Sequence, residues 1–436
     1  MLLKSILARI LRQLARVTIL QYHPLVIGIT GSAGKTSTRE AIAAVLRKKY
    51  TVRTPEKNFN NEIGVPLTIL GIPHHGRNII KWFFGLLGAC GRTHLWKSSY
   101  PQMLILEYGI DHPGDMDILL GIAKPNIGVL TAIGKIPVHV AFFETTEDVV
   151  AEKAKLIGSV PHDGAAVLNV DDPFIRLISK NKKIKVPMMT FGVHQDADVR
   201  IENFHMRMEN DGGRMMPKGI AFKLSYAGNT VPFRINDAFG MPQVYAIAAA
   251  AAVGIVHGMH LVEIAESVQN YTPPVGRMRL ISGINNSLIL DDTYNAAPAA
   301  MDAAIQTLAL IPAKRKIAIL GDMRELGSFS KEAHEEIGKI IAPIANLLIV
   351  VGNEAQQIAE SARAAGMTDA MVYSYGNAKS AAHALPALIA AEDLILIKGS
   401  QAIRMEYIVE ALMAHPEDAV GALVRQEPYW KQKMAR

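Results

Sequence analysis

The sequence is poor in cysteine and has no long apolar run, and each absence excludes a class of protein. Cys90 is the single cysteine among 436 residues, which excludes a disulfide framework and a zinc site made of several thiolates. No uninterrupted apolar stretch reaches the roughly 20 residues that a membrane-spanning helix needs. Half of the residues are apolar and a fifth are charged, as in soluble globular proteins. We therefore expect a cytoplasmic protein of two or three domains.

Acidic residues are missing from two stretches of the chain. None precedes Glu40, and none lies between Glu62 and Glu107. The second gap contains the segment 73–101, which mixes basic residues with aromatic ones. With a formal net charge of +6, this distribution favours an anionic partner, such as a membrane surface or an anionic substrate. We expect no nucleic-acid partner, because no known nucleic-acid-binding signature accompanies the basic residues.

The N-terminal region 1–24 is predicted to be a basic amphipathic helix. Leucine and isoleucine recur at helical spacing over residues 2–19, with arginine and lysine between them. The apolar face either packs on the neighbouring domain, which we favour, or lies on a membrane surface. A cleaved targeting peptide is the weakest alternative, because basic residues interrupt the apolar run too often. We keep open a peripheral contact with the inner face of the membrane through residues 1–20 and 73–101.

Beyond this helix the chain predicts an α/β fold whose larger domain spans residues 25–272. Short apolar strands are expected at 25–30, 103–107, 127–131, 165–169 and 188–191, with helices at 35–49 and 147–157 between them. Such alternation predicts a parallel sheet with helices on both faces. Residues 197–236 differ, because their short alternating runs and glycine-rich turns predict an antiparallel excursion. An alanine-rich buried helix is expected at 243–258.

A second domain is predicted to begin at residue 273 and to run to residue 436. Pro273 and Pro274 mark the boundary. The alternation then restarts, with strands expected at 288–291, 317–320, 347–351 and 394–397. The fold class is therefore α/β, with a central phosphate-loop ATPase domain and a smaller, Rossmann-like C-terminal domain.

A glycine-rich loop between the first strand and its helix is the strongest local motif. It consists of Thr30, Gly31, Ser32, Ala33, Gly34, Lys35 and Thr36. Strand, glycine-rich turn, Lys-Thr and helix is the context of a phosphate-binding loop, in which backbone N–H groups and the helix N-terminus face the phosphates. Lys35 would neutralise phosphate charge, and the Thr36 hydroxyl would bind Mg²⁺. The glycine spacing departs from the common pattern, because five residues separate Gly28 from Gly34.

Together with this loop, further motifs resemble those of the Mur ligases and the related folylpolyglutamate synthases. They are Asn58–Pro66, Glu107–Gly109, Asp291–Pro298, Gly321–Gly327 and Lys398–Ser400. Their order is similar to that in the D-alanyl-D-alanine-adding (MurF) branch. The resemblance implies an ATP-dependent amide ligase that works through an acyl-phosphate. Its default substrates would be UDP-MurNAc-tripeptide, a peptidoglycan precursor, and the dipeptide D-Ala-D-Ala.

The resemblance also implies a catalytic and metal-binding group of residues. Lys35, Glu107, His139 and Lys153 would be catalytic, and two Mg²⁺ ions would be held by Thr36, Glu107, His139 and Lys153. Phosphoryl transfer between anions needs such charge neutralisation. Lys153 matches the family lysine that becomes carbamylated, which turns a cation into an anion able to bind Mg²⁺. Lys155 lies close enough in sequence to be confused with it.

Further residues are expected to bind nucleotide or substrate, again from the resemblance. Arg277, Asp292 and Asn295 would join the loop in holding ATP. The substrate would contact Asn58, Asn60, Asn61, Asp322, Glu325 and Lys398.

Three departures from the family pattern keep alternatives open. The basic and aromatic segment 73–101 is an insertion relative to the family. Only about 25 residues precede the loop, so we expect the family's N-terminal UDP-sugar-binding domain to be absent. Pro242 and Gln243 stand where the family has a His-Asn pair on the adenine side. The alternatives are the same chemistry on another acceptor, or a non-catalytic nucleotide-binding scaffold. We expect a monomer.

Overall fold

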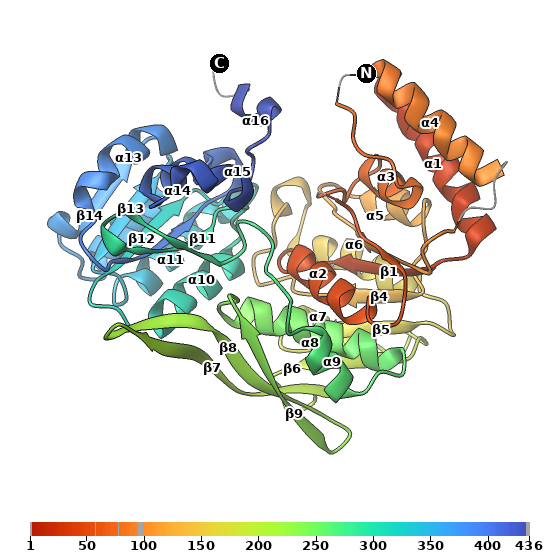
Figure 1. Cartoon of the computed structure of the whole chain (residues 1–436), viewed down its shortest axis with the longest axis horizontal. Coiled ribbons are helices and arrows are strands. Elements are labelled where there is room, and N and C mark those ends of the chain that lie inside the picture. The colour runs from red at the N-terminus through yellow and green to blue at the C-terminus, as the bar shows by residue number, and fades with distance from the viewer. Residues whose placement is uncertain (1, 57, 77, 95–98, 433–436) are drawn as a thin grey trace.

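The computed structural model describes the whole chain except residues 1, 57, 77, 95–98 and 433–436. Two α/β domains lie side by side, each built around its own sheet (Figure 1). The first sheet has nine strands in the order β2-β3-β1-β4-β5-β6-β7-β8-β9, and the second has six in the order β10-β11-β15-β12-β13-β14. The predicted fold class is confirmed.

Parallel strands form the half of the first sheet that carries the glycine-rich loop. They are β1 (Leu25–Thr30), β2 (Val52–Arg53), β3 (Met103–Glu107), β4 (Ile127–Leu130), β5 (Ala165–Asn169) and β6 (Met188–Gly192). Every residue of β3, β4 and β5 is buried, because helices cover both faces, and continuous apolar runs are typical of such strands. The two-residue strand β2 is too short to give a sequence pattern.

Helices pack on both faces of this sheet. α2 (Lys35–Leu46), α8 (Met241–Val256) and α9 (Leu261–Ser267) share one core with the strands. The opposite face is covered by α1 (Leu2–Tyr22), α3 (Gly64–Leu70), α4 (Ile79–His94), α5 (Asp115–Leu120), α6 (Thr146–Gly158) and α7 (Pro173–Ser179). Alanines of α8 are fully buried against α2, which explains the alanine-rich composition: small side chains let the two helices approach closely.

The apolar face of α1 packs on the domain, as the favoured interpretation predicts. Leu11 and Ala15 are fully buried in one core with Trp82 and Ala89 of α4. Met1 and residues 77 and 95–98 of the predicted insertion lie outside the described residues. Among the residues that the structure describes, no helix is both long and apolar enough to span a bilayer.

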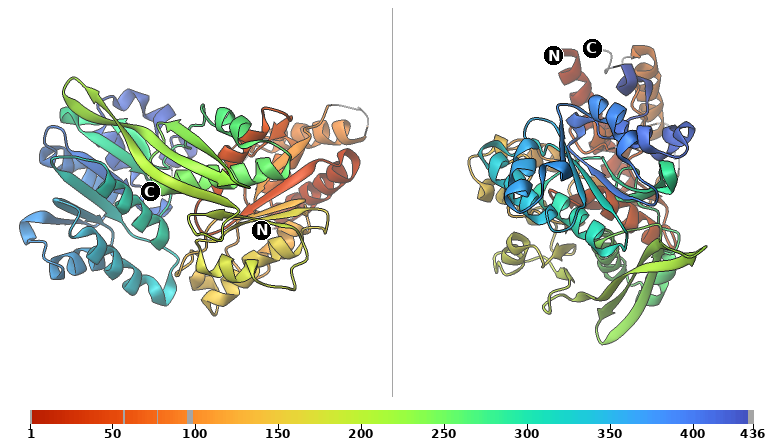
Figure 2. Two further views of the ribbon diagram at one scale, coloured as in Figure 1. Left: turned by 90° about the horizontal axis from the view of Figure 1, so that it is seen from below. Right: turned by 90° about the vertical axis from the view of Figure 1, so that its left-hand side faces the viewer.

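The antiparallel excursion becomes a long arm that reaches the second domain. β7 (Val199–Asp211), β8 (Arg214–Tyr226) and β9 (Asn229–Asn236) pair antiparallel. At the tip, Arg214 donates 2.6 and 3.3 Å hydrogen bonds to backbone carbonyls of Asn286 and Glu392 in the second domain. Three methionines of the arm also pack on the core of that domain. Figure 2 shows the arm bridging the two domains.

The second domain repeats the α/β plan on a smaller scale. Its strands are β10 (Arg279–Ser282), β11 (Leu288–Asp292), β12 (Lys316–Gly321), β13 (Leu347–Val351), β14 (Val372–Tyr375) and β15 (Leu394–Lys398). Only β10 pairs antiparallel, at one edge. α10 (Pro298–Leu310), α11 (Ser330–Ile341) and α12 (Gln356–Ala364) cover one face. α13 (Ala378–Ala384), α14 (Glu406–Leu412) and α15 (Ala419–Ala422) cover the other, and α16 (Pro428–Gln432) follows.

Candidate active site

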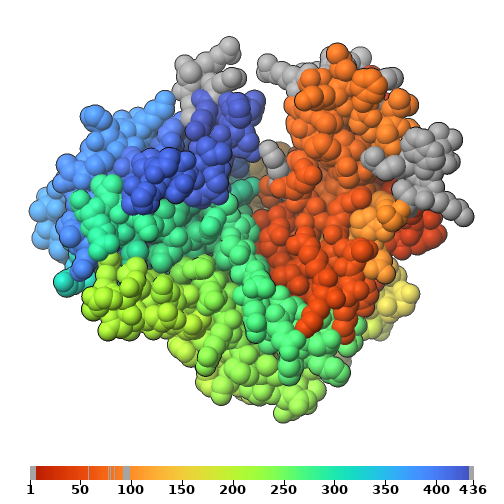
Figure 3. All heavy atoms as spheres, in the orientation of Figure 1, coloured from red at the N-terminus to blue at the C-terminus, as the bar shows by residue number. Residues whose placement is uncertain are grey.

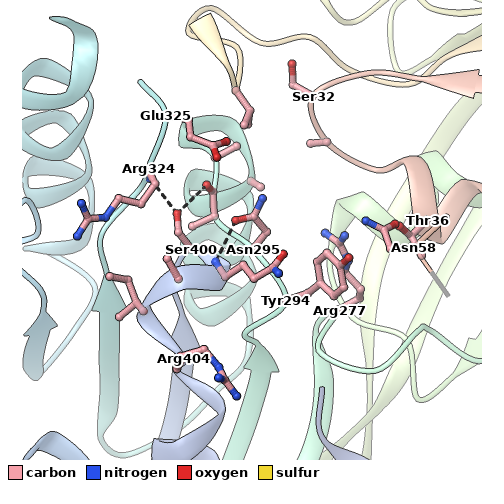
Figure 4. Close-up of a pocket in the computed structure, with 18 of the residues that line it drawn as sticks. Ser32, Thr36, Asn58, Arg277, Tyr294, Asn295, Arg324, Glu325, Ser400 and Arg404 are labelled. Carbon is pink, nitrogen blue, oxygen red and sulfur yellow. Dashed lines mark hydrogen bonds between the residues drawn. The ribbon is translucent and has the colours of Figure 1, made fainter. Parts of the chain in front are cut away.

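A cavity of about 850 Å³ lies between the two domains. On the face shown in Figure 3, a notch separates the domains. Figure 4 shows Ser32 and Thr36 on one side of the cavity and Ser400 on the other. Carboxyl ends of parallel strands border the cavity from both domains, the usual place for ligands in open α/β sheets.

The glycine-rich loop is held in place by the end of β4. The Ser32 N–H donates a 2.6 Å hydrogen bond to the Ala132 carbonyl, and the Thr131 hydroxyl donates one of 2.6 Å to the Ala33 carbonyl. Gly31 has φ +149°, and a Cβ there would lie 2.2 Å from the Thr131 hydroxyl, so this position requires glycine. The loop therefore presents the N-terminus of α2 to the cavity, a built site for phosphate.

Lys35 begins α2 and lines the cavity. Its Nζ donates a 2.6 Å hydrogen bond to the Gly31 carbonyl. Burial lowers the pKa of Lys35; nearby Arg277 lowers it further, whereas Glu107 and Asp111 oppose the shift. A phosphate group entering the loop would supply the negative charge that this buried ammonium lacks.

Glu107 ends β3 fully buried beside the loop. One carboxylate oxygen accepts a 3.4 Å hydrogen bond from the Thr36 hydroxyl, and the other accepts one of 2.7 Å from Arg39. Arg39 was not predicted from the sequence, although it lies one helical turn beyond Lys35 and so on the same face of α2. The adjacent oxygens of Glu107 and Thr36 are hard ligands, which fit Mg²⁺.

Lys153 lies on α6 with only 2% of its surface exposed. A capping box, in which Thr145 accepts from the Asp148 N–H and Asp148 accepts from the Thr145 N–H, fixes the start of this helix. No hydrogen bond or ion pair joins Lys153 to any described residue. Burial holds the pKa of Lys153 well below its usual value, and positive Lys35 lowers it further against Asp111 and Glu152. Its amine is therefore held towards the neutral form.

The nearby Lys155 differs from Lys153 in its exposure, its ion pairs and the direction of its pKa shift. Its Nζ is 2.6 Å from an Asp117 oxygen and 2.7 Å from a Glu152 oxygen. Hydrogen bonds to these carboxylates raise the pKa of Lys155. Lys155 is thus a surface ion-pairing residue, and Lys153 is the better candidate for carbamylation.

His139 bridges the two domains. Its backbone is left-handed, with φ 70°, and its Nδ1 lies 2.8 Å from a Glu325 oxygen of the second domain. Its Nε2 lies 3.4 Å from an oxygen of Asp111. This contact with His139 lowers the pKa of the Glu325 carboxyl. In this conformation His139 thus faces Glu325 and Asp111, whereas Glu107 contacts Thr36 and Arg39.

The predicted metal ligands are therefore not all gathered around one point. Among the described residues, no three His, Cys, Asp or Glu side chains are grouped as a metal site. Asp111 lines the cavity with Glu107 and His139. It was missed by the sequence reasoning, although it follows Glu107 in the loop after β3. Carboxylate and hydroxyl oxygens dominate this set, and these donors fit Mg²⁺.

Two of the three predicted nucleotide residues of the second domain line the cavity. Arg277 lies over the Tyr294 ring, with Cζ 4.1 Å from its centroid. Asn295 lines the cavity and accepts a 3.2 Å hydrogen bond from the Gln401 N–H (Figure 4). Asp292 is instead nearly buried and ion-pairs with Lys398 at 2.5 Å. This pair supports the turn that presents Asn295, because Lys398 also donates a 2.9 Å hydrogen bond to the Asn295 carbonyl.

Some of the predicted substrate residues line the cavity, and others do not. Asn58, Asn60 and Glu325 line the cavity. Asn61 caps α3, where its side chain accepts hydrogen bonds of 3.2 and 2.9 Å from the N–H groups of Ile63 and Gly64.

Asp322 is fully buried beneath the cavity wall. It accepts a 2.8 Å hydrogen bond from the Ala355 N–H and lies 2.7 Å from Arg324, which lines the cavity. Asp322 therefore positions Arg324. The sequence reasoning missed Arg324, although it lies within the Gly321–Gly327 motif.

Gln243, a departure from the family pattern, also has a structural role. It is 1% exposed and donates a 3.1 Å hydrogen bond to the Arg277 carbonyl. Its side-chain oxygen accepts a 2.8 Å hydrogen bond from the Tyr271 hydroxyl. Gln243 therefore fixes the backbone that carries Arg277.

Comparisons with known proteins agree with this geometry. The Mur ligase middle domain matches residues 29–80 and 93–254, and the Mur ligase, glutamate ligase domain matches residues 276–401. The UDP-N-acetylmuramoyl-tripeptide–D-alanyl-D-alanine ligase of Mycobacterium tuberculosis (strain H37Rv) is 30% identical over 430 residues, 91% of this chain and 74% of that protein. The chain belongs to the Mur ligase family. The Bacillus subtilis ligase of the same name is 29% identical, over 93% of this chain and 79% of that one.

Solved structures show the same fold for this Mur ligase. MurF from Acinetobacter baumannii has a TM-score of 0.74 at 23% identity, covering 92% of this chain and 79% of that one. MurF from Thermotoga maritima, solved in complex with ADP, has a TM-score of 0.74 at 24% identity and covers 93% and 83%. The predicted family and fold are confirmed.

Proposed function

We propose that this Mur ligase is a MurF-like, ATP-dependent peptide ligase. It would join D-Ala-D-Ala or a similar amine to a carboxylate of a peptidoglycan precursor, UDP-MurNAc-tripeptide by default. The main support is one cavity that holds both a phosphate loop and polar groups of the facing domain. The relatives named above carry the same reaction in their names.

The reaction proceeds in two balanced steps. A carboxylate oxygen of the acceptor attacks the γ-phosphorus of ATP, and the bond from that phosphorus to ADP breaks. The amine nitrogen then attacks the carbonyl carbon of the acyl-phosphate and loses a proton, and the carbon–oxygen bond to phosphate breaks. Lys35 and the N–H groups at the start of α2 would stabilise the phosphate charge throughout. Domain closure around the cavity keeps water from the acyl-phosphate.

Thr36, Glu107, Asp111 and His139 are the side chains proposed to hold Mg²⁺. The chemistry that Mg²⁺ would supply at these side chains is neutralisation of the negative charge on the nucleotide and the acceptor carboxylate. Lys153 joins this set as a carbamate, a proposal supported by its burial and its lowered pKa. Arg324 and Glu325 line the same cavity and would orient the incoming amine.

Phosphate release tests the proposal directly. The full chain would be assayed with ATP, Mg²⁺, UDP-MurNAc-tripeptide and D-Ala-D-Ala, omitting each in turn, with the product identified by mass spectrometry. Release that needs both substrates supports the MurF-like reaction. Release with another acceptor supports the same chemistry on a different substrate. No release under any condition, with ATP still bound, supports the scaffold alternative.

The same assay on the Lys35→Ala variant tests the role of the glycine-rich loop. The substitution should abolish phosphate release, because the loop loses its only cation while keeping its backbone donors. Turnover at the wild-type rate in this variant would remove the loop from the mechanism.

We also propose that the ligase acts as a monomer in the cytoplasm, with a peripheral membrane contact through residues 1–20 and 73–101. Both domains that line the cavity come from one chain, so the site needs no second copy. Light scattering at micromolar protein should give the mass of one chain; a stable dimer would contradict this.

A further inference from the structure

Helix α4 is apolar on two opposite faces. Its inner face buries Trp82 and Ala89 in the core shared with α1. Its outer face exposes Ile80 (70%), Phe84 (64%) and Leu87 (57%). The spacing of four and three residues places these three side chains in one stripe. Surface helices normally carry polar residues on the outer face, so an exposed apolar stripe points to a binding surface.

Helix α1 lies beside this stripe and adds basic residues to apolar ones. Figure 1 shows α1 and α4 side by side at the upper right of the molecule, on the middle domain. The outward side of α1 exposes Ile6, Ile10 and Leu20, at 49%, 44% and 70%. Arg9 and Arg16 are exposed between them. Arginines interleaved with large aliphatic residues are typical of helices that lie in a membrane interface.

The charge of this region is of one sign. Neither the residues before Glu40 nor those between Glu62 and Glu107 include an acid. An anionic surface is therefore attracted to both helices. A second copy of the chain docked through the same face would bring like charges together, which opposes self-association.

Two of the three stripe residues, Phe84 and Leu87, lie outside the matched ranges of the middle domain. The middle-domain match stops at residue 80 and resumes at residue 93, so it leaves out most of α4, including Phe84 and Leu87. The residues before 29 are likewise unmatched. The exposed face is therefore not a requirement of the ligase fold.

We infer that α1 and α4 together form a binding surface for a bilayer rich in anionic lipid. The apolar side chains enter the headgroup region, and Arg9, Arg16 and Lys81 meet lipid phosphates. This deepens the proposed membrane contact and is independent of which substrates the ligase uses.

Vesicle co-sedimentation of the full chain tests the inference. The vesicles are phosphatidylcholine alone, or phosphatidylcholine with roughly a third phosphatidylglycerol, at low and high salt. Wild type should pellet with the anionic vesicles and lose binding as salt rises. The double variants Phe84→Asp/Leu87→Asp and Arg9→Glu/Arg16→Glu should each weaken binding at least about tenfold. Leu177→Asp, at an equally exposed leucine of α7 (69%), is the matched control and should bind as wild type.

Three results would overturn the inference. The first is equal pelleting of the wild type with neutral and anionic vesicles, and the second is equal pelleting of the wild type and both double variants. The third is a wild-type dimer by light scattering that the same variants dissociate, because the face would then belong to a second copy. Thermal unfolding midpoints show whether each variant is folded. Neither readout uses phosphate release, so a failure here is separate from a failure of the proposed reaction.

Discussion

Among the residues that the structure describes, two lysines are almost completely buried, and their surroundings differ. Lys398, at the end of β15, lies 2.5 Å from an Asp292 oxygen and donates to the Asn295 carbonyl at 2.9 Å. Lys153, on α6, has no hydrogen-bonding or ionic partner among the described residues. Burial lowers the pKa of both. Asp292 opposes the shift at Lys398, whereas Lys35 adds to it at Lys153.

The difference separates a structural lysine from the one that we propose to form a carbamate. A buried ammonium needs a partner, and Lys398 has one. Burial and positive Lys35 outweigh nearby Asp111 and Glu152, and no described carboxylate pairs with Lys153, so its pKa is lowered towards the neutral amine that carbamate formation requires. The amine nitrogen would bond to the carbon of CO₂ and release one proton, leaving an anion. The protein thus supports one lysine with an acid and leaves the other open to modification.

Removing the reactive amine should have the largest effect. Lys153→Ala should lower turnover roughly 100-fold or more, the scale seen when one electrostatic group leaves an active site. Formate or acetate should restore part of the rate by replacing the carbamate. Steady-state phosphate release measures both.

The control for this rescue is Lys398→Ala. No small acid should restore turnover in this variant, because the variant loses a cation and not an anion. Equal rescue of the two variants would contradict the comparison.

The same substitution should change stability in opposite directions at the two sites. Lys398→Met leaves Asp292 buried without its partner and should destabilise the protein by about 3–5 kcal/mol. Lys153→Met in CO₂-depleted buffer replaces an unpaired buried amine and should stabilise it by about 1–2 kcal/mol. Urea unfolding measures both; loss of stability in both variants would show that Lys153 has a partner in solution.

The pH dependence sharpens this second test. The folded-state pKa of Lys153 lies below its unfolded value of 10.5. Between these two pKa values the unfolded chain binds more protons, so the unfolding free energy contributed by this residue rises with pH. In CO₂-depleted buffer, the difference in unfolding free energy between Lys153→Met and wild type should therefore become smaller as pH rises towards 10.5. A gap that stays constant from pH 7 to pH 10 would argue that Lys153 remains charged.

Two neighbouring aspartates allow the same comparison between a paired and an unpaired buried acid. The expected effect on stability is smaller. Asp292 has Lys398, whereas Asp291 is fully buried and accepts only from Thr293. Burial raises the pKa of Asp291 from 3.8 to about 6. In that range the folded state binds more protons, so stability falls as pH rises from about 4 to 6. Asp291→Asn should remove this fall and add at most about 2–3 kcal/mol above pH 6; unchanged stability curves would contradict it.

The sequence predicted the parts of this protein that depend on local patterns. The glycine-rich loop, the parallel strands and the second domain each follow from spacing and composition within short windows. Arg39 was missed, and the structural role of Gln243 was not predicted, because their partners lie far away in the chain, on β3 and on the segment that carries Arg277. Lys153 and Lys155 were hard to separate by motif spacing. The buried face of α6, which holds Val149, Lys153 and Leu156, does separate them.

Some residues inside matched motifs have roles that no motif could show. Asn61 lies in the same run as Asn58 and Asn60, but caps α3. Lys398 and Asp292 belong to two conserved-looking turns, but contact each other and not the cavity. Which polar side chain of a motif faces a ligand is decided by the packing of the loop around it. Sequence spacing alone does not contain that information.

Carbon-13 NMR tests the difference between the two lysines most directly. The full chain, equilibrated with Mg²⁺, ATP and ¹³C-bicarbonate, should show one carbamate carbon signal. The signal should persist in Lys398→Ala and Lys155→Ala and vanish in Lys153→Ala. A wild-type protein without the signal, or a signal that survives Lys153→Ala, would contradict the account.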